Sequence, residues 1–532
     1  MQQQLSLKIL PTEAANDAAI KLLIANTIGK PATAITGYYL LKKSIDARAK
    51  TVWVNITVQA FIDEPFTQRK IQPFYFKDVH TASKKTIIIG AGPAGLFAAL
   101  QLIELGIQPI IIERGKDVRA RRRDLAAINK EGVVNPESNY CFGEGGAGTY
   151  SDGKLYTRSS KRGSIDRILN LFVHFGAPDK ILYESHPHIG TNKLPNIITA
   201  MRLQIEASGG LFLFNKKVVD FTIEQQQIKQ VICADGDSFT AQAIILATGH
   251  SARDIFTLLY HKKILIEAKP FALGVRVEHP QILIDNCQYF TAEKDIGRSA
   301  FLPPAAYSLV QQVNGVGVFS FCMCPGGIIA PAGTAPGELV VNGWSPSKRN
   351  NPYANSGMVV TVEKEAALQV LLKQSVHKNI TINHPLMMLY FQQMVEQKCF
   401  EAGGGNLVAP AQRMVDFSTK KNSTTLPNCS YQPGLQATNL QHVLPNFIYN
   451  SLAKGFELFG KKMNGYYTNE ATVVATESRT SSPVRIPRDG ETLTHPQILN
   501  LYPCGEGAGY AGGIVSAAMD GERVAKQIAT LI

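Results

Sequence analysis

Four side chains in this sequence are candidates for redox or proton-transfer chemistry. Cys322 and Cys324 alternate in a strand-like run, FSFCMC, and strand alternation would place both thiols on one face. Such a pair can exchange electrons or supply a thiolate, but two buried small hydrophobic residues are the favoured interpretation. Lys154 follows a glycine-dense stretch and could be a cation that tunes a cofactor, or an exposed lysine. His188 could act as a general acid or base, or be structural.

The element that would place a cofactor beside these side chains is the segment Thr86–Gly115. It reads as a buried strand, a glycine turn, a helix and a second strand ending in an acid. In the turn, Gly90 allows the bend, Gly92 lets the backbone approach a pyrophosphate, and Gly95 allows close packing of the helix. Glu113 stands where a carboxylate can accept both ribose hydroxyls. The unit predicts a dinucleotide site, with a purely structural unit as the alternative, and its predicted contacts are Gly90, Gly92, Pro93, Ala94, Gly95, Glu113 and Arg114.

A second glycine-rich segment, Leu501–Gly513, directly precedes a helical tail at the far end of the chain. A helix N-terminus offers unpaired N–H groups and the positive end of a dipole, which suits anionic groups. In flavoproteins such an element serves the flavin N1–C2=O edge, so its pairing with the first turn favours FAD. Glu506 would meet the ribityl chain or the pyrophosphate. A C-terminal packing helix is the alternative, and the predicted FAD contacts are Gly505, Glu506, Gly512, Gly513 and Ile514.

Three strand-like runs lie between the two glycine segments. Asn215–Gly249 alternates hydrophobic and polar residues and ends in AIILATG. Flavin domains of the two-layer type carry a β-meander there, followed by a strand ending in ATG near the adenine. Val218, Thr248 and Gly249 are therefore predicted to lie on the adenine side of FAD.

Two further segments could contact the cofactor. The loop Cys141–Leu155 could pass against the flavin ring, or be a structural loop, and its candidate glycines are Gly145, Gly146 and Gly148. In the run of four arginines at Arg119–Arg123, Arg122 and Arg123 are candidates to clamp the diphosphate, while the rest are expected on a solvated helix face. Later in the chain, Arg479, Arg485 and Arg488 could form an anion-binding loop. Exposure of each arginine to solvent is an equally favoured interpretation.

The chain resembles the uncharacterised FAD-dependent dehydrogenases, bacterial flavoproteins of the glutathione-reductase-like superfamily. Besides the two flavin segments, the motifs that carry the resemblance span nearly the whole chain: SIDAR (Ser44–Arg48), CFGEGGAGTYSDGKL (Cys141–Leu155), HIGTNKL (His188–Leu194), FCMCPGG (Phe321–Gly327), APAQR (Ala409–Arg413) and ESRTSSPVRI (Glu477–Ile486). Asn192 stands where the family usually has Asp, and Ser478 where it usually has Thr. The family has no established reaction, so the resemblance implies fold and cofactor rather than substrate.

The composition suits a soluble enzyme with anionic ligands. The chain has 532 residues, 45% of them hydrophobic, which predicts large cores and more than one domain. A net charge of +12 spread along the chain indicates solubility and attraction for FAD, NAD(P)H or acidic substrates. The 8 cysteines form no CxxC pair and no zinc spacing, which predicts reduced thiols and no metal site. The start MQQQLSLKIL lacks a signal-peptide pattern and no membrane span is expected, so a cytoplasmic location is predicted.

These patterns predict an α/β fold in three domains. The expected domains are a small N-terminal α+β domain (1–80), a Rossmann-like FAD-binding domain of a parallel sheet plus a β-meander (81–267, completed by 491–532), and an inserted α+β cap or substrate domain (268–490). The N-terminal domain is expected to contain a strand, a helix and two further strands, followed by a linker at 65–80.

The predicted function is that of an FAD-dependent oxidoreductase, a dehydrogenase that transfers hydride between flavin and an organic substrate or NAD(P)H. There is no second convincing GxGxxG, because Gly403–Asn406 follows no apolar strand, so a nicotinamide would dock transiently. The expected partner is a small, anionic substrate held by the cap domain. Two alternatives stay open: a flavin-dependent RNA-modifying protein, for which the charge of the N-terminal domain is too weak to claim nucleic-acid binding, and a non-catalytic flavin-binding redox sensor.

Overall fold

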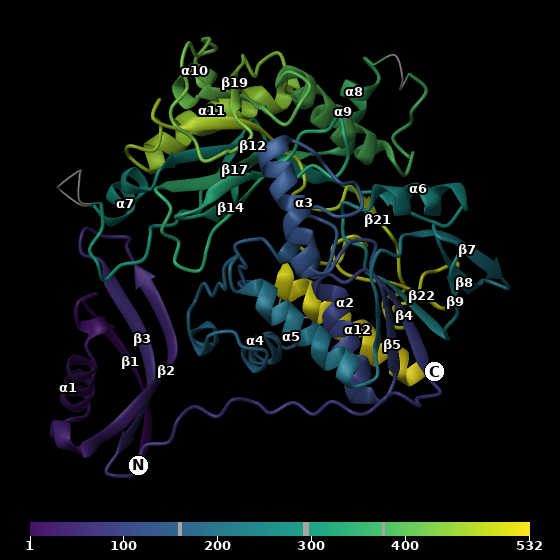
Figure 1. The fold of residues 1–532 in the computed structure, drawn as a ribbon. Coiled ribbons are helices and arrows are strands. Elements are labelled where there is room, and N and C mark those ends of the chain that lie inside the picture. Colours follow the sequence, from purple (N-terminus) through teal and green to yellow (C-terminus); the bar gives the residue numbers. More distant parts are fainter. Residues whose placement is uncertain (158–161, 291–296, 375–377) are drawn as a thin grey trace.

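The computed structural model describes residues 1–157, 162–290, 297–374 and 378–532. Figure 1 shows three parts: a small N-terminal domain in purple, a part built on a parallel sheet, and a part built on a large mixed sheet. Residues 63–84, all of them described, join the first two parts and form neither helix nor strand. The predicted fold class, an α/β flavoprotein with a small α+β domain at its N-terminus, is confirmed.

The N-terminal domain packs one helix against an antiparallel sheet. Its elements are β1 (Gln2–Ile9), α1 (Asp17–Ile28), β2 (Ile35–Asp46) and β3 (Trp53–Ile62), and the strand order is β1-β3-β2. The Asn16 side chain caps α1 by accepting the N–H groups of the next turn, and Gly29 ends the helix in the left-handed conformation. Ile24, Val58 and their neighbours form a separate buried core.

The parallel sheet brings distant parts of the chain together. Its strands are β4 (Lys85–Ile89), β5 (Gln108–Ile112), β6 (Leu211–Leu213), β10 (Ala243–Leu246) and β22 (Leu501–Pro503), in the order β22-β10-β4-β5-β6. Ile87 and Ile88 are fully buried, as expected for a strand covered on both faces. Ile245 of β10 pairs with Ile88 on one side and with Tyr502 on the other, so the C-terminal glycine segment leaves the sheet beside the first glycine turn.

The helix that closes the chain packs on the helix that follows the first turn. α2 spans Pro93–Leu105 and α12 spans Ile514–Leu531, and the two lie side by side next to β4 and β5 in Figure 1. A Cβ at Gly521 of α12 would lie 2.1 Å from the carbonyl oxygen of Ala94, so a glycine is needed for this close approach. The other elements of this part are α3 (Val118–Glu131), α4 (Ile165–His174), α5 (Leu194–Ala207), α6 (Arg253–His261) and the meander strands β7 (Val218–Glu224), β8 (Gln227–Cys233) and β9 (Ser238–Phe239).

The large mixed sheet is inserted between β10 and β22. Its strands, in the order β13-β14-β17-β12-β20-β18-β19, are β12 (Phe271–Pro280), β13 (Val310–Val313), β14 (Val316–Cys324), β17 (Tyr353–Val362), β18 (Ala409–Arg413), β19 (Leu435–Ala437) and β20 (Thr472–Glu477). Strand alternation in β12 directs Leu273, Val275 and Val277 into the hydrophobic core and places Arg276 on the opposite face. The remaining elements are α7 (Gln281–Tyr289), α8 (Lys364–Leu371), α9 (Met387–Ala402), α10 (Met414–Ser418), α11 (Asn446–Lys462) and the short pairs β11 (Glu267–Ala268) with β21 (Val484–Arg485) and β15 (Ile328–Pro331) with β16 (Val341–Trp344).

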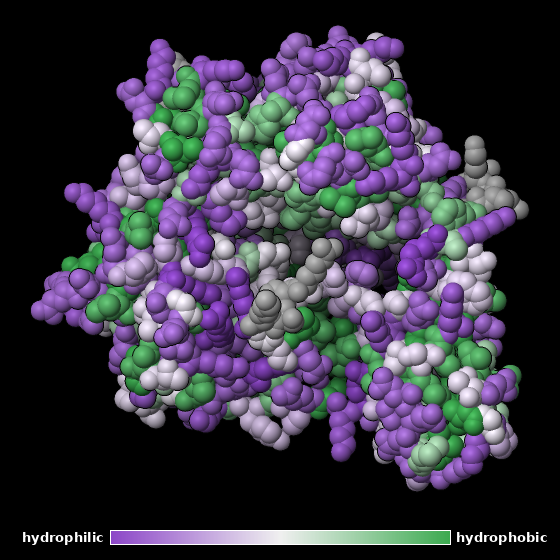
Figure 2. Space-filling model, turned by 180° about the vertical axis from the view of Figure 1, so that it is seen from behind, coloured by the Kyte–Doolittle hydropathy of each residue, from purple (hydrophilic) through white to green (hydrophobic). Residues whose placement is uncertain are grey.

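The N-terminal domain projects from the rest of the molecule, as Figure 2 shows from behind. It contacts the body through β2, because the N–H of Lys43 donates to the carbonyl of Tyr183 at 2.7 Å and the N–H of Ser185 donates to the carbonyl of Lys43 at 2.9 Å. The centre of the face in Figure 2 is hollowed between the upper and lower parts of the body. Across the residues that the structure describes, every helix is too short or too polar to cross a membrane.

Candidate cofactor and active site

A cavity of about 390 Å³ opens where β4 and β10 end. It extends from the start of the meander to the end of β14 in the large mixed sheet. The predicted site residues that line it are Gly90, Gly92, Pro93, Ala94, Glu113, Arg114, Gly146, Gly148, Lys154, Val218, Thr248, Gly249, Cys322, Glu506, Gly512, Gly513 and Ile514. The predicted residues outside its lining are Gly95, Arg122, Arg123, Gly145, His188, Cys324 and Gly505.

Two helices begin at this cavity. Gly92 is the N-cap of α2 and Gly513 is the N-cap of α12, and neither helix has a side chain that caps its first N–H groups. Because the first N–H groups of a helix have no partner within it, both N-termini present donors and a positive dipole end to the cavity. The N-terminus of α2 suits an anionic diphosphate, and the N-terminus of α12 suits an electron-rich flavin edge.

The glycines of the cavity show whether the site fits a dinucleotide. A Cβ at Gly92 or Gly512 would meet no protein atom within 4 Å, and the φ of Gly92, −74°, is open to any residue. Protein packing therefore does not require glycine at these two positions. A ligand that occupied the space beside them would require it, because a Cβ would take up part of that space. Gly95 differs, because its Cβ would lie 2.1 Å from the carbonyl oxygen of Gly90, which is the helix–strand packing role predicted for it. The cavity fits FAD by this criterion.

Gly145 and Gly505 are also used for packing. A Cβ at Gly145 would lie 2.1 Å from Oγ1 of Thr149, and a Cβ at Gly505 would lie 2.9 Å from Cβ of Ala94. Both glycines have a positive φ, so they shape the loops from outside the cavity.

Glu113 is fixed by the backbone around it. Its carboxylate accepts hydrogen bonds from the N–H groups of Ala91, Gly115 and Gly143, each at 2.9 Å. A carboxylate has roughly four acceptor positions, so roughly one stays open toward the cavity. With roughly one open acceptor position, Glu113 can accept a hydrogen bond from about one ribose hydroxyl, whereas the sequence predicted that it accepts both.

The arginines of α3 differ from the prediction. Arg122 and Arg123 are exposed and lie outside the cavity lining, whereas Arg121 is fully buried. Arg121 donates to the carbonyl oxygens of Asn139, Tyr140, Glu144 and Gly146 at 2.7–2.9 Å, so it holds the glycine loop from behind. Adjacent residues of a helix point about 100° apart, and the sequence pattern alone did not indicate which arginine faces inward.

The arginines of the predicted anion-binding loop mostly have partners within the protein. Arg479 lines the cavity but pairs with Glu396 at 3.0 Å and with Glu338 at 3.2 Å. Arg488 pairs with Asp520 of α12 at 2.6 Å, and Asp520 also accepts the N–H of Gly505 at 2.9 Å. These two arginines therefore stabilise the structure around the cavity.

His250 is a cavity residue that sequence reasoning missed, although it directly follows the ATG signal. Its Nε2 lies 3.6 Å from Oε2 of Glu506. Burial, with Arg479 and Arg253 nearby, lowers the pKa of His250 to about 4, so the imidazole is neutral at physiological pH. Burial, reinforced by the charge of Cys322, raises the pKa of Glu506 to about 7, where it can hold or release a proton.

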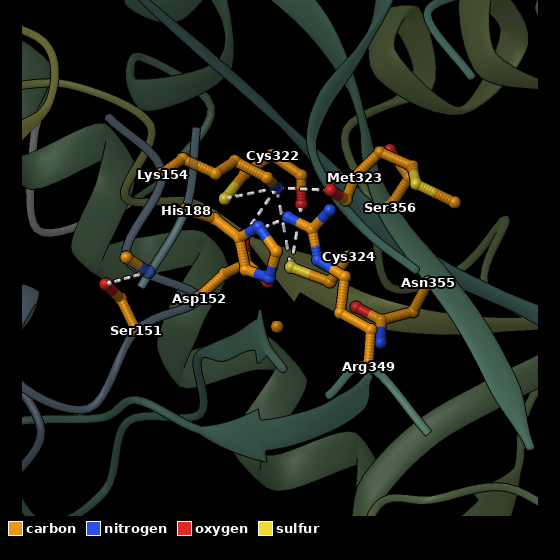
Figure 3. Close-up of polar contacts among 12 residues, drawn as sticks. Ser151, Asp152, Lys154, His188, Cys322, Met323, Cys324, Arg349, Asn355 and Ser356 are labelled. Carbon is orange, nitrogen blue, oxygen red and sulfur yellow. Dashed lines mark hydrogen bonds and ion pairs between the residues drawn. The ribbon is translucent and has the colours of Figure 1, made fainter. Parts of the chain in front are cut away.

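The cysteine pair lies at the end of β14, as Figure 3 shows. The register of β14 against β17 shifts between Phe321 and Cys324, and Cys322 has a φ of 47°. This bulge interrupts the predicted alternation, so Cys322 lines the cavity while Cys324 is fully buried. A non-glycine residue at positive φ costs of order 1–3 kcal/mol, and such strain concentrates at functional sites.

Lys154 stands between the two thiols. Its Nζ lies 3.7 Å from Sγ of Cys322 and 3.7 Å from Sγ of Cys324, and it also contacts the carbonyl oxygen of Met323 (Figure 3). The pKa of Cys322 lies well below its usual range, because a hydrogen bond from Cys324 and the charges of Lys154 and Arg276 outweigh burial. The hydrogen bond to Cys322 and burial raise the pKa of Cys324.

His188 lies next to this cluster but outside the cavity lining. Its backbone pairs with that of Lys154, and its Nε2 lies 3.3 Å from the carbonyl oxygen of Ser347. Burial and the charge of Arg349 lower its pKa to about 4. It is therefore neutral near pH 7, and its role as an acid or base stays a prediction.

Comparisons with known proteins show the family of the chain. Residues 270–480 match the model of the FAD-dependent protein C-terminal domain, residues 84–259 match pyridine nucleotide-disulphide oxidoreductase, and residues 1–61 match a domain of unknown function. An "Uncharacterized protein" of Clostridium beijerinckii is 38% identical over 509 residues, which cover 92% of this chain and 91% of that protein. The chain belongs to this family of FAD-dependent proteins. It is an oxidoreductase with FAD as its cofactor, as the sequence predicted.

Several solved flavoprotein structures are distantly similar. CtdE in complex with FAD is 9% identical, with 84% of each chain covered and a TM-score of 0.31. A salicylate hydroxylase substrate complex is 12% identical, covering 85% of this chain and 79% of that one, with a TM-score of 0.34. Tetracycline destructase Tet(55) is 11% identical, covering 82% and 78%, with a TM-score of 0.33. At these TM-scores no conclusion about this chain's reaction follows.

Proposed function

We propose that this oxidoreductase is a dehydrogenase that moves a hydride between FAD and an organic substrate or NAD(P)H. The observation that carries the proposal is that two helix N-termini and a lysine–thiol cluster line one cavity. The bound FAD supplies a hydride acceptor or donor at its N5 atom. The residues of the chain bind it, orient it and supply charges and protons around it.

The binding end of the cavity sets the orientation of the cofactor. The open acceptor position of Glu113 suits a ribose hydroxyl, and the unpaired N–H groups at the start of α2 suit the pyrophosphate. The N-terminus of α12, which begins at Ile514, would then stabilise the flavin edge that becomes electron-rich on reduction. Val218 and Thr248, which also line the cavity, would hold the adenine.

The other end of the cavity supplies charge and a proton. The Lys154 ammonium lowers the energy of negative charge beside it, which favours hydride acceptance there. Glu506, whose pKa is raised to about 7, can exchange a proton with a substrate in the neutral pH range. His250 is the neutral neighbour of this carboxyl group.

The substrate would be a small, anionic molecule bound between the parallel sheet and the large mixed sheet. Ligand sites commonly form between such parts, and here Phe321 and Asn342 of the large part face the glycine segments across the cavity. The net charge of +12 favours an anion. A nicotinamide would dock transiently, because the sequence holds no second convincing dinucleotide turn.

An anaerobic titration tests this function. The FAD-loaded protein would be mixed with NADH, NADPH and a panel of small organic acids and alcohols while the absorbance of oxidised flavin is followed. Bleaching by at least one of these reductants is expected, with Lys154→Met bleaching more slowly. A flavin that dithionite bleaches but that none of these compounds reduces would contradict the proposal.

A further inference from the structure

The bulge at the end of β14 gives one of the two neighbouring thiols access to the cavity. We propose that Cys322 is a nucleophilic thiolate that attacks soft electrophiles in the FAD cavity, with Lys154 as its counter-ion and the protonated Cys324 thiol beside it. In this step a sulfur lone pair forms a bond to the electrophilic atom, and the leaving group departs with the electrons of the broken bond. The nucleophile itself does not depend on hydride transfer, but its use on a natural substrate rests on the proposed function.

The position of Cys322 is the first reason. Its side chain lines the cavity, and its backbone is held at a φ of 47° by the register shift of β14. Cys324, two residues later, is fully buried. An incoming molecule can therefore reach the sulfur of Cys322 but not that of Cys324. Strain that presents a reactive atom to a cavity points to function at that atom.

The charges around Cys322 are the second reason. Lys154 Nζ lies 3.7 Å from its sulfur, and the Arg276 guanidinium donates to its carbonyl oxygen at 2.7 Å. Three carboxyl groups also face Cys322. Asp152 is paired with Arg349 at 2.8 Å, and Glu477 is paired with Arg276 at 2.7 Å. The third is Glu506, whose pKa is raised to about 7. Lys154 Nζ also lies 4.0 Å from Oδ2 of Asp152, which is farther than its 3.7 Å distance to either sulfur, so its charge can balance a negative sulfur.

The neighbouring thiol divides the roles within the pair. Cys324 Sγ lies 3.7 Å from Lys154 Nζ and 3.5 Å from Nη2 of Arg276, yet it is the thiol whose pKa is raised. The Cys324 thiol keeps its proton and donates a hydrogen bond to the carbonyl oxygen of Cys322 at 3.3 Å. The pair therefore holds one negative charge, on the sulfur that faces the cavity.

Alkylation of the purified full-length protein by iodoacetamide tests the inference. Iodide leaves as the S–C bond forms, and mass spectrometry of peptides gives the rate at each cysteine from about pH 5 to about pH 9. Cys287 and Cys429 are the internal references, since both are partly exposed and their pKa values are raised, by burial at Cys287 and by burial and Glu278 at Cys429. Near pH 6, Cys322 should react on the order of tenfold or more faster than either reference thiol.

The shape of the pH profile separates a thiolate from mere exposure. The rate at Cys322 should stay nearly flat with pH, whereas the reference rates should rise about tenfold per pH unit. Lys154→Met should make the Cys322 profile rise with pH, and Lys154→Arg should restore the flat profile. If Lys154→Met does not fold, the wild-type profile alone decides. A wild-type Cys322 that is unreactive, or whose rate rises like the references, overturns the inference, and this outcome is independent of the flavin-bleaching titration.

Discussion

Replacing Gly92 by alanine should weaken FAD binding while leaving the FAD-free protein at least as stable. The backbone at Gly92 (φ −74°, ψ −176°) suits alanine, and the new Cβ would meet no protein atom within 4 Å. A glycine-to-alanine change at such a position stabilises a protein by about 0.4–1 kcal/mol. In the complex the same methyl group occupies space that the cofactor needs, and overpacking costs about 1–3 kcal/mol. The Kd for FAD should therefore rise about 5- to 140-fold.

Calorimetric titration of FAD and thermal denaturation of the FAD-free protein would measure the two effects separately. Gly95→Ala is the contrasting variant, because its Cβ would lie 2.1 Å from the carbonyl oxygen of Gly90, and it should lower both stability and affinity. Gly490→Ala is the matched control, since a Cβ there also meets no protein atom within 4 Å but Gly490 lies outside the cavity lining. Wild-type affinity in Gly92→Ala would refute the placement of FAD against this turn.

Two further variants test the region around α12 and the proton-bearing end of the cavity. Asp520→Asn breaks a buried ion pair with Arg488 and should cost about 3–5 kcal/mol of stability. Both the Tm and the FAD affinity should fall, because Asp520 also accepts the N–H of Gly505. An unchanged Tm would contradict this. The pKa of Glu506 rises from 4.5 to about 7 on folding, so its ionisation opposes folding as the pH rises through this range. Relative to Glu506→Gln, the wild-type FAD-free protein should thus lose stability between about pH 4.5 and about pH 7 and no more above it, and parallel Tm–pH curves would disprove the shift.

The parts of the fold that local patterns encode were predictable. The apolar run before Gly90, the glycine turn and the acid at Glu113 lie within one strand–helix–strand unit, whose spacing alone indicates its shape. The glycine segment before α12 was likewise read from local sequence, and the pairing of β10 with both β4 and β22 shows how the two segments meet.

The contacts that depend on distant partners were not predictable. Arg479 reads as a free cation in the sequence, yet Glu338 and Glu396, which lie far from it along the chain, neutralise it. The bulge in β14 depends on pairing with β17, so the FSFCMC pattern indicated alternation where the structure turns Cys322 into the cavity. Side-chain periodicity describes a regular strand, and such irregularities arise from the partner strand.

Amide hydrogen exchange with and without FAD tests the central claim, that two distant glycine segments bind one cofactor. The N–H groups at the start of α2 and of α12 have no helical partner, so they should exchange quickly in the free protein. Saturating FAD should slow exchange at Ala94 and Gly95 and in Ile514–Ser516 together, at the same FAD concentration. Protection of one segment without the other, or of neither, would contradict the account.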